Sequence, residues 1–93
     1  MDTVQLDGNS LDAITFATQN TRILAIRAPR GLLGCGYIST ETAAKVGDAL
    51  AVVSGVSNYE DMLKASVKAV SPAAEALGVT PGMSGRDALL KML

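Results

Sequence analysis

The chain has 93 residues and a formal net charge of −1, and 48% of its residues are apolar while 18% are charged. A chain of this length can build one hydrophobic core but not two, and this composition is too apolar for a disordered segment. We therefore expect one folded domain over residues 1–93. The longest uninterrupted apolar run, 49–53, is far shorter than the roughly 20 residues of a membrane-spanning helix, and no secretory signal pattern opens the sequence. These features predict a cytoplasmic protein with no membrane partner.

The absence of histidine limits the chemistry that one chain can perform. It excludes a Ser-His-Asp triad, a Cys-His pair, a histidine general base and a His-ligated zinc within the chain. The basic residues are scattered and the aromatic residues are two tyrosines and one phenylalanine, so no basic face with stacking side chains is expected and no nucleic acid partner is predicted. The lone Cys35 cannot form an internal disulfide, which suits a reducing compartment. We expect neither a metal nor a cofactor.

The N-terminal third predicts an antiparallel meander of three strands. Val4 and Leu6 alternate with polar residues, Gly8-Asn9 indicates a turn, and two further strands follow over 13–18 and 22–28. The glycine-rich stretch 29–36 is predicted to be a loop, and an extended pattern resumes at Tyr37-Ile38.

The rest of the chain predicts short helices that alternate with strands. Four serines supply helix caps: Ser39 before a helix to Val46, Ser57 in a capping box with Glu60, Ser71 before Pro72, and Ser84 before the last helix. The buried face of the third helix is expected at Ala73, Ala76 and Leu77. Strands are expected over 48–54 and 65–70. The fold class predicted from this order is α/β (α+β): a two-layer sandwich with one mixed β-sheet, an N-terminal antiparallel meander and helices packed on the sheet.

Three segments in fixed order carry a family resemblance. They are Arg30-Gly31-Leu32-Leu33-Gly34-Cys35-Gly36-Tyr37, then Gly47-Asp48-Ala49, then Gly82-Met83-Ser84-Gly85-Arg86-Asp87-Ala88-Leu89-Leu90. Together they resemble the YunC-like family of uncharacterised proteins, over nearly the whole chain. The resemblance implies a two-layer α/β sandwich, in agreement with the pattern above, and it implies no catalytic residue.

Two glycine-rich loops are the candidate sites. Cys35 is the candidate catalytic residue, because a thiolate near an arginine is a nucleophile, with Gly34, Gly36 and Tyr37 as pocket-lining residues. The alternative for Cys35 is a small buried hydrophobe.

The second loop opens the last helix, where free amides favour an anion, so Ser84, Gly85, Arg86 and the distant Arg30 are the candidate anion-binding residues. The alternative here is a simple turn and N-cap, since the segment lacks a P-loop pattern.

Two functions remain open at this point, and the sequence does not decide whether the chain is an enzyme. In the first, the Gly31–Tyr37 and Gly82–Arg86 loops meet and bind an anionic small metabolite, with or without chemistry at Cys35. In the second, the chain is a non-catalytic module that forms a homo-oligomer or docks on a partner, because so small and apolar a chain has more apolar area than it can bury alone.

Overall fold

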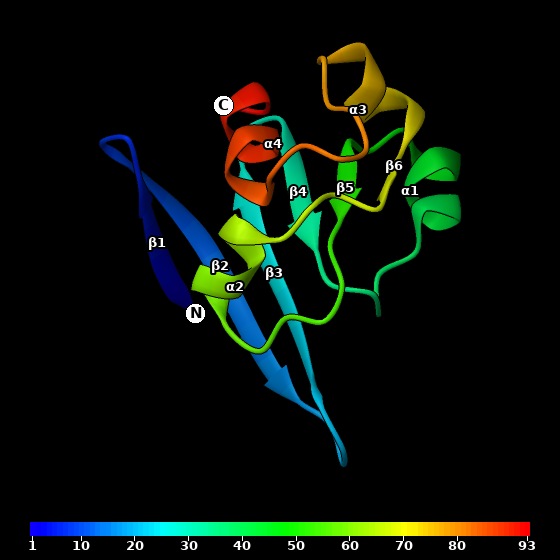
Figure 1. The fold of residues 1–93 in the computed structure, drawn as a ribbon. Coiled ribbons are helices and arrows are strands. Elements are labelled where there is room, and N and C mark those ends of the chain that lie inside the picture. The colour runs from blue at the N-terminus through cyan, green and yellow to red at the C-terminus, as the bar shows by residue number, and fades with distance from the viewer.

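A six-stranded mixed sheet and four short helices make up the computed structural model, which describes residues 1–93 (Figure 1). The strands are β1 (Asp2–Leu6), β2 (Asn9–Ala17), β3 (Arg22–Ala28), β4 (Gly31–Gly34), β5 (Leu50–Val52) and β6 (Ala69–Val70). The helices are α1 (Thr40–Val46), α2 (Tyr59–Lys64), α3 (Pro72–Ala76) and α4 (Gly85–Lys91). The strands lie in the sheet in chain order, and only the β4–β5 pair is parallel. This agrees with the predicted fold class.

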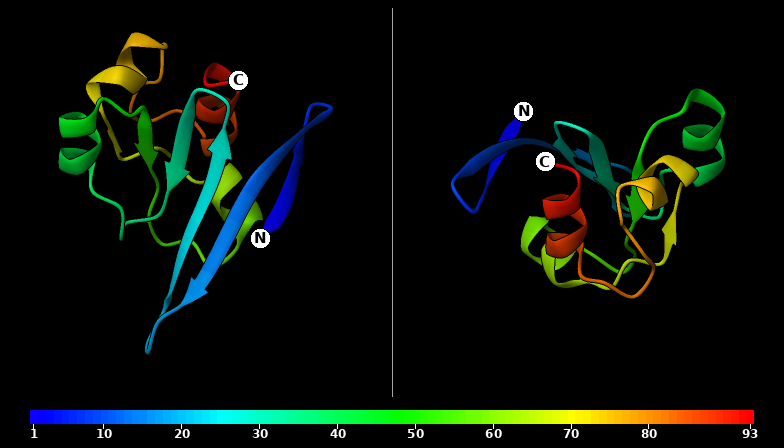
Figure 2. Two further views of the ribbon diagram at one scale, coloured as in Figure 1. Left: turned by 180° about the vertical axis from the view of Figure 1, so that it is seen from behind. Right: turned by 90° about the horizontal axis from the view of Figure 1, so that it is seen from above.

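Helices α2, α3 and α4 cover one face of the sheet and enclose the main core. Alternate residues of the strands point to this face, so that Leu6, Ile26 and Leu33 are fully buried against Met62 of α2 and Leu89 of α4. Helix α1 packs on the opposite face, where Ala43 contacts Leu50 and Val52. Seen from above, α4 and α1 lie on different sides of the sheet (Figure 2). None of the four helices is long and apolar enough to cross a bilayer.

The first hairpin turns one residue earlier than predicted. Leu6 pairs with Asn9, which leaves Asp7 and Gly8 as the two turn residues, with φ of 48° and 82°. Two positive φ angles define the turn type that matches the twist of a tight hairpin, and Asp and Gly tolerate them best. The turn is therefore Asp7-Gly8 rather than Gly8-Asn9.

The predicted loop 29–36 contains a strand, β4, in its centre. A Cβ on Gly31 would lie 2.2 Å from Sδ of Met92, and one on Gly34 would lie 2.8 Å from Cδ1 of Ile38. These glycines therefore permit close packing on the two faces of a strand, and they do not form turns. The extended segment predicted at Tyr37-Ile38 is instead a turn that leads to the Ser39 cap of α1.

The second half matches the prediction in element order and differs in detail. The cap of α2 is Asn58, whose side chain accepts from the Asp61 amide at 2.8 Å, while the Asp61 carboxylate accepts from the Ser57 amide at 3.0 Å. The predicted Ser57–Glu60 capping box is thus displaced by one residue. The strand expected over 65–70 is limited to β6, and the buried residue of α3 is Ala74, with Ala76 exposed.

Candidate functional site

Cys35 follows directly after β4 and lies at the edge of the main core. Its side chain is on the helix-covered face and the residue is 5% exposed. Its Sγ accepts a hydrogen bond from the Leu24 amide at 3.3 Å, and its own amide donates to the Leu24 carbonyl at 3.0 Å. The thiol predicted as a nucleophile is therefore nearly enclosed, with one hydrogen bond already made to its sulfur.

A hollow of about 390 Å³ lies over the carboxyl ends of β4 and β5 and includes Cys35 in its wall. From the end of β4 the chain continues to α1 on one face of the sheet, and from the end of β5 it continues to α2 on the other face. Neighbouring parallel strands whose connections leave to opposite faces create a crevice at their carboxyl ends, the usual place for ligands in open α/β sheets. The hollow is lined by Thr21, Arg22, Cys35, Gly36, Tyr37, Ser54, Gly55 and Val56.

The wall of this hollow supplies hydrogen-bond donors and one positive charge. The backbone amides of residues 36–37 and 54–56 donate to no acceptor within the protein. Arg22 is held at the rim, because its Nη1 donates to the Ser57 carbonyl at 3.0 Å. No carboxylate lines the hollow. Its polar groups therefore complement a negatively charged ligand.

The second candidate loop uses most of its polar groups inside the protein. Ser84 caps α4 and accepts from the Asp87 amide at 3.0 Å, and the Gly85 amide donates to the Ala65 carbonyl at 2.9 Å. Arg86 forms an ion pair and a hydrogen bond with Asp7 in the first hairpin turn. These contacts are those of a turn and N-cap with a surface ion pair, which was the alternative for this loop.

Arg30 lies at the other end of α4 from the residues with which it was grouped. Its Nε donates to the Leu93 carbonyl at 2.8 Å and its Nη2 to the Lys91 carbonyl at 3.1 Å, so it caps the last turn of the helix. Because α4 runs from Gly85 to Lys91, Arg86 lies in its first turn while Arg30 binds the chain at its last turn, so the two guanidinium groups are at opposite ends of the helix.

The Gly31–Tyr37 and Gly82–Arg86 segments approach each other in the core and not at a solvent-facing hollow. A Cβ placed on Gly85 would lie 3.0 Å from Cδ2 of Leu33, so the segments contact through buried groups. Of the residues expected to line a pocket, Gly36 and Tyr37 lie in the wall of the hollow beside Cys35, whereas Gly34 is buried against Ile38. Ser84, Gly85 and Arg86 do not line it. The hollow instead uses Arg22 and the segment after β5, which the sequence pattern did not single out.

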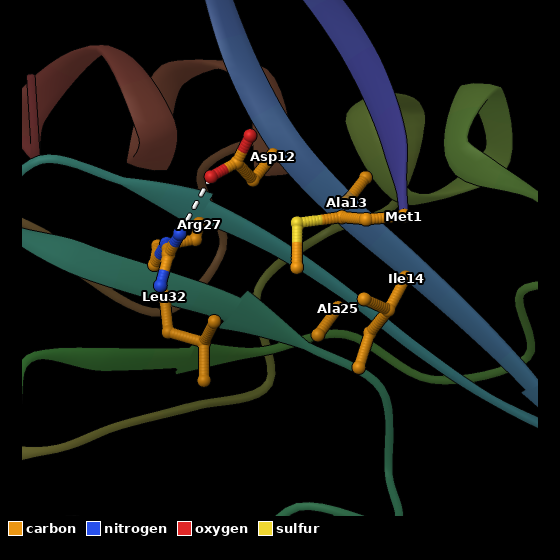
Figure 3. A pocket seen from close by; sticks show the side chains of 7 residues that line it. All are labelled: Met1, Asp12, Ala13, Ile14, Ala25, Arg27 and Leu32. Atoms are coloured by element: carbon orange, nitrogen blue, oxygen red, sulfur yellow. Dashed lines mark hydrogen bonds and ion pairs between the residues drawn. The ribbon is translucent and has the colours of Figure 1, made fainter.

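A second hollow, of about 190 Å³, lies on the face of the sheet that α2–α4 leave uncovered (Figure 3). Met1, Ala13, Ile14, Ala25 and Leu32 form its apolar lining, and Asp12 and Arg27 close one side with an ion pair of 2.5 Å. The sequence signal for this surface was present in the apolar residues on both faces of β2 and β3, where the exposed Ile14 follows the buried Ala13 and three apolar residues, Leu24 to Ile26, follow one another.

The surroundings of Tyr59 shift the pKa of its hydroxyl. Its hydroxyl donates to Asp2 Oδ2 at 2.6 Å and accepts from Thr15 Oγ1 at 2.8 Å, which connects α2 to β1 and β2. Burial raises the pKa of Tyr59, and the hydrogen bond to the Asp2 carboxylate raises the pKa further. No group of three or more Cys, Asp or Glu residues is arranged to hold a metal ion.

Comparisons with known proteins place the chain among relatives without an assigned activity. The model of a family described as a domain of unknown function, DUF1805, matches residues 34–92. The chain is 32% identical over 94 residues to the uncharacterized protein YunC of Bacillus subtilis (strain 168), an alignment that covers 97% of this chain and 93% of that protein. The crystal structure of TA1206 from Thermoplasma acidophilum, a protein of unknown function, superposes with a TM-score of 0.93 at 33% identity and covers 99% of this chain and 90% of that one.

Proposed function

The chain belongs to the YunC-like DUF1805 family, and from this premise we propose that it is a binding domain for a small anionic metabolite, held in the hollow at the carboxyl ends of β4 and β5. The observation that carries the proposal is that this hollow is lined by hydrogen-bond donors and a positive charge. It offers unpaired backbone amides, the Ser54 hydroxyl and the Arg22 guanidinium, and no carboxylate. A phosphate or carboxylate group accepts from all three kinds of donor.

The position of the hollow supports the same function. Residues 36–37 and 54–56 lie in the loops that follow two parallel strands, β4 ending at Gly34 and β5 at Val52, so the sheet fixes the position of the loops that supply the donors. The proposal keeps the ligand class predicted from the sequence, and it replaces the Gly82–Arg86 loop by Arg22 and the segment after β5.

Cys35 enters this proposal as a wall residue and not as a nucleophile. The sulfur already accepts a backbone hydrogen bond and the residue is 5% exposed, so a substrate atom would reach it only after local opening. We expect iodoacetamide to alkylate Cys35 at least about 100-fold more slowly in the native chain than in the unfolded chain. Equal alkylation rates in the native and the unfolded chain would show that the Cys35 thiol is accessible and would make it a candidate nucleophile again.

The test of the proposal is ligand-induced stabilisation with inorganic phosphate and acetate as probes. A ligand at ten times its dissociation constant stabilises the native state by about 1.4 kcal/mol, which raises the melting temperature of a domain of this size by several degrees. Potassium chloride at equal ionic strength controls for general salt effects. Two-dimensional NMR of the amides of residues 36–37 and 54–56 should then report the binding position.

Two arginine variants locate the site. We expect Arg22→Gln to abolish the stabilisation by phosphate, and Arg86→Gln to retain it, because Arg86 is engaged with Asp7 outside the hollow. The reverse pattern would assign the anion site to the Gly82–Arg86 loop. If neither probe stabilises the chain beyond the chloride control, the proposed function is wrong.

A further inference from the structure

The exposed large hydrophobic side chains gather on one side of the molecule. They are Met1, Ile14, Phe16, Tyr37 and Val46. Met1 and Ile14 line the hollow of Figure 3, and Phe16 follows Ile14 on the same face of β2. Tyr37 and Val46 line a neighbouring hollow at α1, and the two hollows share Leu32. We call the β1–β4 surface that carries Met1, Ile14, Phe16, Ile23, Ala25 and Leu32 the open face.

We propose that the open face binds a second copy of this chain, so that the protein is a homodimer with two sheets packed face to face. Exposed apolar residues scattered singly are normal on a protein surface, but large ones confined to one side mark an interaction surface. Phe16 is 68% exposed and Ile14 is 43% exposed on this face, and the one helix that packs on the same face, α1, lies over β5.

The charges on the open face favour a second copy over a partner of strong single charge. The face carries one acidic and one basic side chain, Asp12 and Arg27, which pair directly across β2 and β3. Two copies related by a two-fold axis would present both signs to each other, and neither copy would meet an excess of its own charge. A polyanion or a strongly acidic protein would find no net positive charge to bind.

The hairpin formed by β2 and β3 supplies a second, independent argument. Figure 1 shows that this hairpin extends well beyond the rest of the sheet. Phe16 pairs with Ile23 in the projecting part, and the residues of β2 from Ile14 to Ala17 are exposed. An isolated two-stranded ribbon is only marginally stable in water. In an isologous dimer each hairpin would pack on the partner's sheet, and its apolar side chains would leave water.

The size of the open face limits how a dimer can form on it. The nine residues of β2 span about 30 Å and four strands at about 4.8 Å spacing span about 19 Å, so a full rectangle would have a projected area of about 570 Å², and the shorter β1, β3 and β4 reduce it. Specific interfaces bury about 800 Å² on each partner. The proposed interface therefore includes the Tyr37 and Val46 region at α1, next to the open face.

The experiment is sedimentation velocity of the full chain from about 1 to about 100 µM, compared with two lysine variants. We expect a dimer of the wild-type chain, and we expect Phe16→Lys to raise its dissociation constant by at least about 30-fold. The control is Ala76→Lys, an exposed position on α3 at the covered side, which should leave the dimer unchanged. Circular dichroism and a thermal melt establish that both variants fold.

Each outcome decides the proposal. A wild-type chain that stays monomeric at about 100 µM overturns it, whatever else the face then binds. Ile14→Lys is a second substitution on the same face. A dimer that neither Phe16→Lys nor Ile14→Lys dissociates also overturns the proposal. The result is separable from the anion proposal, because Phe16 and Ile14 do not line the hollow at Cys35 and Arg22.

Discussion

At some positions of this protein, the packing space and the hydrogen bonds around a residue restrict which amino acid can stand there. Gly85 is the first residue of α4, where a Cβ would lie 2.0 Å from the backbone oxygen of Met62. Ser71 is fully buried, and its Oγ accepts from the Leu50 amide at 2.8 Å and donates to the Asp48 carbonyl at 2.8 Å. In both places a single residue sets the contact between two segments that are distant in sequence.

Gly85→Ala tests whether close packing sets the sequence at the start of α4. Helix propensity alone predicts a gain of about 0.5–1 kcal/mol from this substitution. We expect the opposite, a loss of about 3 kcal/mol or more, because the new methyl group meets backbone and forces α4 away from α2. Urea denaturation measures the change. Gly36→Ala is the matched control, since its Cβ would have only one contact, at 3.9 Å, and it should be close to neutral.

Tyr59 gives the stability a dependence on alkaline pH. Because the folded pKa of Tyr59 lies above its unfolded value, the stability it contributes is complete below pH 10 and is lost as the pH rises through the folded pKa. Ionisation removes the proton donated to Asp2 and places two negative charges together. We expect Tyr59→Phe to cost about 1 kcal/mol at pH 8 and less at pH 11. Urea denaturation at the two pH values measures the change, and Tyr37→Phe, which removes a hydroxyl without a hydrogen-bond partner in the chain, controls for the loss of a phenol oxygen.

At the scale of elements, the features that depend on residues close in the sequence were predictable. Ser39, Ser71 and Ser84 cap helices as predicted, because an N-cap is a contact between a side chain and an amide two or three residues away. Strand β4 was not predictable in this way, since the role of Gly31 depends on Met92, which lies far along the chain. The same reason explains the candidate site. Gly36 and Tyr37 were proposed from local glycine content, whereas Arg22 reaches the hollow only through the pairing of β3 with β4.

The start of α2 offers a direct test of capping register. Asn58 caps the helix with its side chain, while Ser57 contributes only its backbone amide to Asp61. We therefore expect Asn58→Ala to lower the free energy of unfolding by about 1 kcal/mol and Ser57→Ala to change it by less than about 0.5 kcal/mol. Thermal melts of the two single variants are sufficient. A larger loss for Ser57→Ala would place the cap where the serine spacing predicts it.

At the scale of the whole molecule, two surfaces differ in their chemistry. The hollow at the ends of β4 and β5 is polar in its donors and carries one cation, whereas the open face is apolar with a balanced ion pair. Tyr37 borders both regions, since it lines the hollow at Cys35 and the one at α1. Arg22 and Phe16 belong to one region each, which is why their substitutions distinguish the two proposals.

The chain-order arrangement of the sheet bears on how the protein reaches its native state. Since every strand pairs with the one before it, each new strand can add to an edge that already exists, and none has to enter between two that are already joined. The first three connections have two, four and two residues, which keeps the entropy lost at each closure small, while the steps from β4 to β5 and from β5 to β6 each span a helix. Assembly can therefore advance in the direction of synthesis, from the first hairpin toward the α4 helix that closes the core.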